Sequence, residues 1–356
     1  MRAVPWVALR QRLEEERLLR RVVEGPEAPP PETIVLHHLA DDSRRVQAGG
    51  LFAAIRGTSA DGHSFIDKAI QNGARIVICE AVPENARTRY PSTLFAHVRS
   101  SRSALAEIAS AYYGDPAGAL QMVGVTGTNG KTTVAYLTHH LLKALGTPTG
   151  LISTIEVRTG TVAANAALTT PGPIELQRTL HHMEDDGCEA CTMEVSSHAL
   201  DQERVRSIGY DVAIFTNLTS DHLDYHGTVG AYRAAKKKLF DGLAPGATAV
   251  VNADDDSARF MVQDTDATVM TVGLDAEHRS SVDVPVEIQE SSLNGLRLRL
   301  DGRERSFRLA GRFNAYNLAV AYATGCALGY DAGAVLDALE EAPPVPGRFE
   351  QLHFDD

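Results

Sequence analysis

Cysteine is scarce in this sequence, with four among 356 residues, which excludes a fold held together by a framework of disulfides. Positive charge is also in short supply. Lys and Arg number 34 against 46 Asp and Glu, a net charge of −12, which argues against a protein dedicated to nucleic acid. No stretch approaches 18 consecutive apolar residues, and residues 1–21 are too charged for a secretory signal. We therefore expect no membrane span and a cytoplasmic location.

The chain also lacks an internal repeat of fixed period, which excludes solenoids and propellers. It contains instead short apolar runs that alternate with segments of helical periodicity, a pattern that predicts an α/β fold with a mostly parallel sheet. The length indicates about two domains. Strands are expected at 33–36, 51–55, 75–79, 94–97, 120–125, 190–195, 212–217 and 247–252, and one arm of an antiparallel hairpin at 296–300. Helices are expected within 1–25 and at 65–72, 103–113, 131–145, 174–185, 229–240, 254–262, 314–328 and 332–341.

The strongest local signal is GTNGKTT at 127–133, which stands between a predicted strand and a predicted helix. Glycines let backbone N–H groups turn toward phosphate oxygens, and the N-terminus of the helix adds partial positive charge. In such a loop Lys131 reaches the β- and γ-phosphates and Thr132 binds Mg²⁺. Val125 stands where the general pattern has its first glycine, so the loop is a variant of the phosphate-binding loop.

Three further clusters carry polar residues close to predicted strands. Glu194 ends one strand, where ligands bind in doubly wound sheets, and could hold Mg²⁺ or order a water molecule. His222 and His226 follow another strand; each is a potential metal ligand, and His226 has a purely structural role as its alternative. Residues 236–238 are three consecutive lysines on a helix, where the ordinary interpretation is a solvated face.

Together these clusters resemble the Mur ligases, which build the peptide of bacterial peptidoglycan. The segments MEVSSHAL at 193–200, FTNLTSDHLDYHG at 215–227 and AAKKKLF at 234–240 resemble the MurE type, which adds the third amino acid. Residues 41–65 resemble the uridine-nucleotide domain of that type. The resemblance implies a small N-terminal α/β UDP-binding domain at 1–100, a P-loop-type central ATPase domain with a mostly parallel sheet at 101–345, and at 346–356 the stub of a C-terminal domain that is otherwise absent.

The resemblance also implies which residues bind the UDP-muramoyl substrate. Asp42 and Ser43 would contact uracil and ribose, and Thr58, Ser59 and Ala60 would line the nucleotide-sugar site. The muramoyl-peptide arm would be bound by Thr169 and Thr170, and its carboxylates by Ser196, Gln202 and Arg204.

For the reaction itself, the resemblance implies a site for ATP, two Mg²⁺ ions and a lysine carbamate. Lys131, Glu194, His222 and Lys236 would be catalytic, with Lys236 converted to a carbamate by CO₂. The metal ligands would be Thr132, Glu194, His222 and the Lys236 carbamate. ATP would be bound by Gly127, Thr128, Asn129, Gly130, Lys131, Thr132 and Thr133, with Asn314 near adenine. Arg348, and Asp254 or its neighbours in NADDD, would lie near the ribose or phosphates. Lys237 and Lys238 remain surface candidates.

The implied function is ATP-dependent amide ligation through an acyl phosphate. The substrates would be UDP-N-acetylmuramoyl-L-Ala-D-Glu and an amino acid, diaminopimelate or lysine, and the protein is expected to be a monomer with no nucleic-acid partner. Because a third domain is expected to be missing, the isolated chain is expected to ligate poorly. The alternatives are another carboxylate–amine ligase of the folylpolyglutamate or cyanophycin type, a non-catalytic substrate-binding fragment, and a P-loop NTPase or kinase. Cys188 and Cys191 could suggest zinc, but without a second such pair we expect them to be buried and inert.

Overall fold

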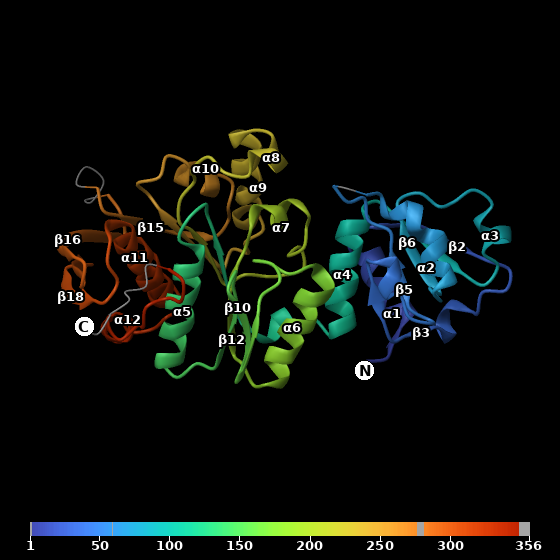
Figure 1. The fold of residues 1–356 in the computed structure, drawn as a ribbon, viewed down its shortest axis with the longest axis horizontal. Helices are drawn as coiled ribbons and strands as arrows, with labels where there is room; N and C mark the ends of the chain where they lie inside the picture. Colours follow the sequence, from blue (N-terminus) through green and yellow to red (C-terminus); the bar gives the residue numbers. More distant parts are fainter. Residues whose placement is uncertain (1, 59, 276–280, 349–356) are drawn as a thin grey trace, which may run out of the picture. The chain divides into compact units, whose positions relative to one another are not determined.

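A computed structural model describes residues 2–58, 60–275 and 281–348 (Figure 1). The chain divides into two compact units. The first takes the chain up to Pro116 together with Gly172–His181 and Gln202–Ser207, and the second takes the rest. The first unit therefore runs further along the chain than the domain expected at 1–100, because the helix that begins at residue 101 clusters with it.

A five-stranded sheet forms the centre of the first unit. Its strand order is β2-β7-β6-β5-β4, and β4 to β7 run parallel while β2 is antiparallel to β7. The strands are β2 Leu19–Glu24, β4 Leu39–Ala40, β5 Leu51–Ala53, β6 Ile76–Cys79 and β7 Leu94–Val98, and β1 Val4–Pro5 pairs separately with β3 Val35–Leu36. The helices are α1 Trp6–Glu15, α2 Ile66–Gln71, α3 Ala86–Arg89 and α4 Ser101–Tyr113, with short 3₁₀ turns at Pro31–Thr33, Ser43–Arg45 and Gly62–Phe65.

Strand β6 shows why the sequences of the strands in this sheet are continuous apolar runs. Ile76 and Ile78 join a core that includes Trp6 of α1, while Val77 and Cys79 join a second core on the other face. Successive side chains point to opposite faces of a strand, and a parallel sheet covered on both faces must be apolar on both. The expected helices within 1–25 are only half right: 6–15 is helical, but Leu19–Glu24 is a strand that pairs with β7.

The second unit contains an eleven-stranded sheet of order β11-β10-β9-β12-β8-β13-β14-β15-β16-β17-β18. The run from β9 to β16 is parallel, which confirms the predicted α/β class with a mostly parallel central sheet, and both ends are antiparallel. The strands are β8 Gln121–Thr126, β9 Thr149–Ile152, β10 Glu156–Thr159, β11 Val162–Asn165, β12 Ala190–Glu194, β13 Val212–Phe215, β14 Thr248–Asn252, β15 Thr268–Gly273, β16 Val284–Ser292, β17 Gly295–Leu300 and β18 Arg303–Phe307.

Helices α5 and α11 pack beside each other against this sheet (Figure 1). They share one large apolar core with the inner strands, to which α5 contributes Leu137 and Leu141 and α11 contributes Leu318 and Tyr322. The helices are α5 Lys131–Ala144, α7 Ser197–Asp201, α8 Leu223–His226, α9 Val229–Asp241, α10 Ala258–Val262, α11 Arg312–Ala327 and α12 Ala332–Glu340; α6 Pro173–Asp185 begins in the first unit, and a 3₁₀ turn covers Pro116–Ala119.

Strand order fixes where a ligand can bind. Strand β8 lies between β12 and β13, and the chain reaches β12 on one side before it returns to β13 on the other. Such a reversal opens a crevice at the carboxyl ends of the strands, which is where open α/β sheets bind ligands. The segments that leave these three ends are the loop at 127–130, the residues after Glu194 and the residues after Phe215.

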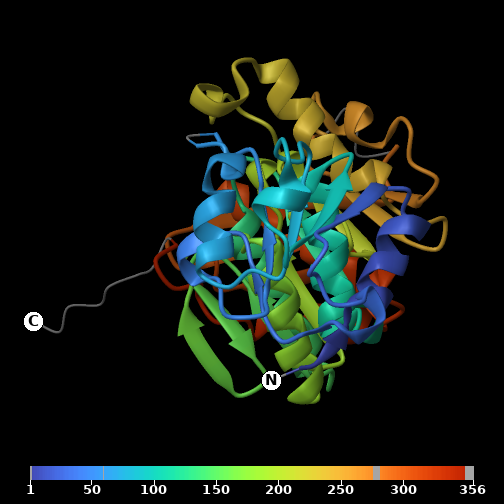
Figure 2. The same ribbon diagram turned by 90° about the vertical axis from the view of Figure 1, so that its right-hand side faces the viewer.

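The β10–β11 hairpin at one edge of the sheet, green in Figure 2, has no counterpart among the predicted elements. All four residues of β11 are exposed, so the strand shows no alternation of apolar and polar residues. Within the described parts of the chain, no helix is long and apolar enough to cross a membrane.

Candidate active site

The loop between β8 and α5 has the geometry of a phosphate cradle. Gly127 and Gly130 have φ angles of +147° and +87°, which are conformations that L side chains rarely adopt. A Cβ atom at Gly127 would lie 1.9 Å from Oγ1 of Thr216, and one at Gly130 would lie 2.5 Å from Oδ1 of Asn317. Both glycines are therefore required, and α5 begins directly after them at Lys131.

Two residues at the end of β13 hold this loop in place. The Thr216 hydroxyl donates to the Asn129 carbonyl at 2.6 Å. The Asn217 side chain forms a pair of bonds with the same residue, accepting from the Asn129 N–H and donating to its carbonyl, each at 3.0 Å. Asn252, at the end of β14, donates in turn to the Thr216 carbonyl at 3.0 Å. Three neighbouring strands thus fix the loop.

Two lysine amino groups meet at one carbonyl oxygen of the loop. Lys131 Nζ donates to the Gly127 and Thr128 carbonyls at 3.0 and 2.9 Å, and Lys236 Nζ donates to the Gly127 carbonyl at 2.7 Å. Burial lowers the pKa of Lys131. Burial, with the nearby charge of Lys131, lowers the pKa of Lys236 to about 6. Asp221 and Glu194 act in the opposite direction on Lys131.

The three lysines of α9 have three different environments. Lys236 is 1% exposed, and its Nζ lies 4.5 Å from the centre of the Tyr232 ring. Lys237 is not the surface residue that was expected, because it is 7% exposed and its amino group pairs with Asp241 and with Asp264. Lys238 has a half-exposed side chain that pairs with Asp201 at 3.2 Å. Only Lys236 is directed at the loop.

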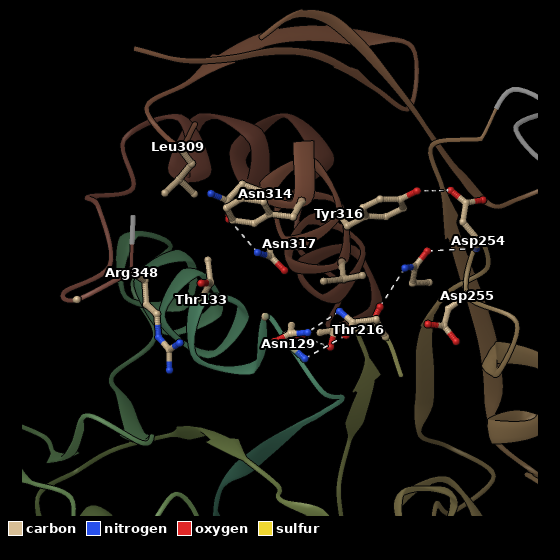
Figure 3. Close-up of a pocket in the computed structure, with 16 residues that line it drawn as sticks. Asn129, Thr133, Thr216, Asp254, Asp255, Leu309, Asn314, Tyr316, Asn317 and Arg348 are labelled. Carbon is tan, nitrogen blue, oxygen red and sulfur yellow. Dashed lines mark hydrogen bonds between the residues drawn. The ribbon is translucent and has the colours of Figure 1, made fainter. Parts of the chain in front are cut away.

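A cavity of about 700 Å³ opens beside the phosphate cradle, within the size range of small-molecule sites. Asn129 and Thr133 line it from the loop and α5, and the beginning of α11 lines it from the opposite side (Figure 3). Its remaining lining includes Thr216, Asn217, Asn252, Asp254, Asp255, Leu309, Phe313, Tyr316, Val320 and Arg348.

Asn314, Asp254 and Arg348, which were expected near ATP, all line this cavity. Asn314 is buried, donates to the Ala310 carbonyl at 2.7 Å and accepts from Asn317 at 2.8 Å. The Asp254 carboxylate accepts from the Tyr316 hydroxyl at 2.8 Å, as Figure 3 shows. Arg348 donates to the Thr132 hydroxyl at 3.3 Å, which places a cation at the N-terminus of α5.

Glu194 and the threonines of the TTP segment form one hydroxyl network. Glu194 is fully buried, and both its carboxylate oxygens accept hydrogen bonds from Thr154, at 2.7 Å from the N–H and 3.1 Å from the hydroxyl. The Thr154 and Thr169 hydroxyls lie 3.0 Å apart. Thr170 donates to the Glu194 carbonyl at 2.8 Å and accepts from the Ser196 N–H at 3.0 Å. Four residues predicted to bind metal or substrate therefore lie together.

His222 lies in a cluster of aromatic rings. Its ring centre is 4.9 Å from that of His198 and 6.1 Å from that of Tyr232, the ring on which Lys236 rests. His226 contacts the Ser197 hydroxyl at 3.0 Å, which fits the structural alternative. In the parts of the chain that the structure covers, no group of three or more His, Cys, Asp or Glu side chains is arranged to hold a metal. The predicted metal ligands Thr132, Glu194, His222 and Lys236 are a different set. Thr132 and Lys236 are not His, Cys, Asp or Glu.

In the first unit, the residues expected at the uridine nucleotide lie near the carboxyl ends of β4 and β5. Ser43 is buried in a 3₁₀ turn that is capped by Asp42. The bond from Arg44 to this carboxylate lowers the pKa of Asp42 to about 2, so Asp42 is already engaged within the turn. Thr58 and Ala60 are exposed, and Ser59 lies outside the described residues.

Gln202 and Arg204 also belong to the first unit, where the guanidinium of Arg204 donates to Oε1 of Gln202 at 2.7 Å. Cys188 and Cys191, in the second unit, are both buried, and burial raises the pKa of both thiols. They are buried, as expected, and a raised pKa disfavours the reactive thiolate.

Sequence reasoning gave no role to several residues of the site: Thr154, Thr216, Asn217, Asp221 and Asn252. Thr216, Asn217 and Asp221 lie within the segment 215–227, in which only the histidines were singled out. The signal that could have found the set is position, since four of the five follow or end strands β9, β13 and β14 of the sheet that contains β8.

Known families account for most of the chain. The Mur ligase middle domain matches residues 125–325, and the domain described as the Mur ligase family catalytic domain matches residues 35–113. A UDP-N-acetylmuramoyl-L-alanyl-D-glutamate–2,6-diaminopimelate ligase of Parabacteroides distasonis is 42% identical over 338 residues, which are 95% of this chain and 68% of that protein. The corresponding enzyme of Phocaeicola vulgatus is 43% identical over 87% of this chain and 63% of its own length.

A solved structure of an enzyme with the same name superposes with a TM-score of 0.75 at 26% identity, covering 92% of this chain and 67% of that one. The chain spans about two thirds of the length of the curated relatives that it matches. The fold, the phosphate loop and the sequence similarity all indicate the same family, and the chain belongs to the Mur ligase family.

Proposed function

We propose that this protein takes part in peptidoglycan synthesis as an ATP-dependent ligase that joins 2,6-diaminopimelate to the glutamate of UDP-N-acetylmuramoyl-L-Ala-D-Glu. The observation that carries the proposal is the meeting of Lys131 and Lys236 at the Gly127 carbonyl, beside a cavity with room for a nucleotide. The names of the relatives support the choice of the UDP-dipeptide as the substrate and of diaminopimelate as the amino acid. The first unit would bind the uridine nucleotide and the second would bind ATP. We also propose a cytoplasmic location and a monomeric state.

Chemistry explains why a ligase needs this concentration of cationic groups. A carboxylate oxygen of the substrate attacks the γ-phosphorus of ATP, the bond to ADP breaks, and an acyl phosphate forms. The amine of the amino acid then attacks the acyl carbon and loses a proton, and phosphate leaves. Carboxylate and triphosphate both carry negative charge, so a positioned cation such as Lys131 stabilises the transition state. Arg348, at the N-terminus of α5, supplies a second positive charge.

Mg²⁺, when bound, neutralises charge on the phosphates, and Thr132, Glu194, His222 and Lys236 are the residues we propose to hold it. A lysine can serve there only after its charge is reversed. With a pKa of about 6, the Lys236 amine is largely uncharged at neutral pH, so its lone pair can bond to CO₂. The amine then loses one proton and becomes a carbamate, which offers oxygen ligands. A ¹³C carbamate resonance under ¹³CO₂ that Lys236→Arg abolishes and Lys238→Arg retains would support this; its presence in Lys236→Arg would refute it.

Substrate recognition tests the proposal independently of turnover. Calorimetric titration with UDP-N-acetylmuramoyl-L-Ala-D-Glu should give tighter binding than UDP-N-acetylmuramoyl-L-Ala, because Thr169, Thr170 and Ser196 of the second unit are proposed to bind the peptide arm. Equal affinity for the two would contradict the assignment of these residues to the glutamate-bearing substrate.

Release of ADP separates a ligase from a simple NTPase. We expect ADP formation over many turnovers to require both the UDP-dipeptide and the amine, since the acyl phosphate must react with the amine before the next turnover. ADP formed at the same rate without an amine acceptor would instead indicate an NTPase or a kinase.

A further inference from the structure

The turn that follows β9 is closed by several hydrogen bonds and carries Thr154, which contacts Glu194. Ser153 closes the turn, since its N–H and its hydroxyl donate to the Glu156 carbonyl at 3.0 and 2.9 Å. Ser153 Oγ also accepts from the Glu156 N–H at 3.0 Å, and Ser153 is fully buried. The Tyr136 hydroxyl of α5 donates to the Glu156 carboxylate at 2.7 Å, which ties the turn to the helix that follows the phosphate loop.

Both oxygens of the Glu194 carboxylate are held by Thr154. The backbone N–H donates to Oε1 at 2.7 Å, and the hydroxyl lies 3.1 Å from Oε2. The Thr169 hydroxyl lies 3.0 Å from the Thr154 hydroxyl. The Thr154 hydroxyl therefore lies within hydrogen-bond distance of both the Glu194 carboxylate and the Thr169 hydroxyl.

We propose that Thr154 is a positioning residue that fixes the direction of the Glu194 carboxylate toward a divalent cation. It also connects that carboxylate to Thr169, on the segment proposed to bind the peptide arm. This inference rests on the proposed function, in which Glu194 is a Mg²⁺ ligand. Fixing both oxygens leaves one orientation for their remaining lone pairs, and loss of an outer-shell partner of a metal ligand typically costs 10–100-fold in metal affinity.

The Mg²⁺ dependence of nucleotide binding provides the test, with the fluorescent analogue mant-ATP as the probe. Thr154→Val removes the hydroxyl and keeps the N–H, so half-maximal binding should require about 10-fold more Mg²⁺. Thr154→Ser keeps both donors and should match the wild type. The matched control is Thr192→Val, because Thr192 is fully buried two residues before Glu194 and its hydroxyl has no hydrogen-bond partner among the described residues.

Glu194→Gln separates this inference from the function on which it rests. A raised Mg²⁺ requirement in both Glu194→Gln and Thr154→Val supports the positioning role. A raised requirement in Glu194→Gln alone overturns that role and leaves the proposed metal ligand in place. An unchanged Mg²⁺ requirement in Glu194→Gln would contradict both the proposal that Glu194 binds Mg²⁺ and the positioning role of Thr154. If Thr154→Val does not fold, Thr154→Ser still tests the proposal. This variant keeps the N–H and the hydroxyl, so a Mg²⁺ requirement for Thr154→Ser as high as that of Glu194→Gln would contradict the positioning role.

Discussion

At the residue scale, the Gly127 carbonyl brings together two amino groups that repel each other. Lys131 and Lys236 both donate to it, both are largely buried, and burial favours the uncharged form of an amine. The two lysines respond differently to this environment. The pKa of Lys236 falls to about 6, while Glu194 and Asp221 support the charge of Lys131. One lysine is thus suited to bind phosphate as a cation and the other to react as a neutral amine.

The low pKa of Lys236 predicts a pH-dependent cost to stability. Between pH 6 and the ordinary lysine pKa of 10.5, the unfolded chain binds a proton that the folded protein does not, so wild-type stability rises with pH across this window. Lys236→Met removes the cost and should raise the free energy of unfolding at neutral pH by roughly 1–4 kcal/mol, as when buried ionic groups are replaced by apolar ones. The gain should shrink toward pH 10.5. Urea unfolding across the window measures it.

Lys238→Met is the control for that experiment, since the Lys238 side chain is half exposed on the same helix. Its effect should be small at every pH. A gain for Lys236→Met that stays constant with pH would contradict a depressed pKa for Lys236.

Lys131 should matter for the rate of the proposed reaction. Removing one preorganised stabiliser of transition-state charge costs about 10²–10³-fold in rate, so Lys131→Ala should slow substrate-dependent ADP formation by that factor. Lys143→Ala is the matched control, because Lys143 is an exposed residue in the last turn of the same helix. Unchanged turnover in Lys131→Ala would remove the loop from the mechanism.

At the scale of elements, the site depends on the contact between the phosphate loop and β13. A Cβ atom at Gly127 would lie 1.9 Å from the Thr216 hydroxyl, which itself holds the Asn129 carbonyl. Gly127→Ala should therefore displace the loop and weaken mant-ATP binding by more than about 10-fold, a difference of about 1.4 kcal/mol in binding free energy. Titration of the fluorescence measures the affinity.

Gly146→Ala is the control for backbone strain without a clash. Gly146 has a φ of +89°, and a Cβ there would meet nothing within 4 Å. Strain of about 1–3 kcal/mol should lower stability while nucleotide affinity stays unchanged. Equal loss of affinity in both variants would mean that the clash at Gly127 is not what shapes the loop.

Some of these elements and contacts could be predicted from the sequence, and others could not. The phosphate loop was predictable because strand, glycines, lysine and helix are contiguous between 121 and 144. The contacts of Thr216, Asn217 and Asn252 with that loop were not predictable, even though the first two lie in the quoted segment 215–227, because these contacts depend on the strand order β8-β13-β14, which no local pattern encodes. The β10–β11 hairpin was missed for a different reason: a strand exposed on both faces has no period of two in its hydrophobicity.

At the scale of the whole molecule, the net charge of −12 coexists with a proposed site for anions. Lys131, Lys236 and Arg348 come from three segments far apart in the sequence and concentrate around one loop. Binding of phosphates depends on this local field within a low-dielectric crevice, and not on the charge of the whole chain. Overall acidity therefore argues against a dedicated nucleic-acid surface without excluding a nucleotide site.

The division into two compact units predicts that two nucleotides protect different parts of the chain. A ligand at 100 times its Kd stabilises the folded state that it binds by about 2.7 kcal/mol, so amide exchange should slow within the unit that holds it. Hydrogen–deuterium exchange should show that Mg·ADP protects the phosphate loop and 252–255 in the second unit. Uridine diphosphate should instead protect peptides around 41–60 in the first unit. Protection of the second unit by uridine diphosphate would contradict the assignment of uridine recognition to the first, because its proposed contacts, Ser43 and Thr58, lie wholly within the first unit.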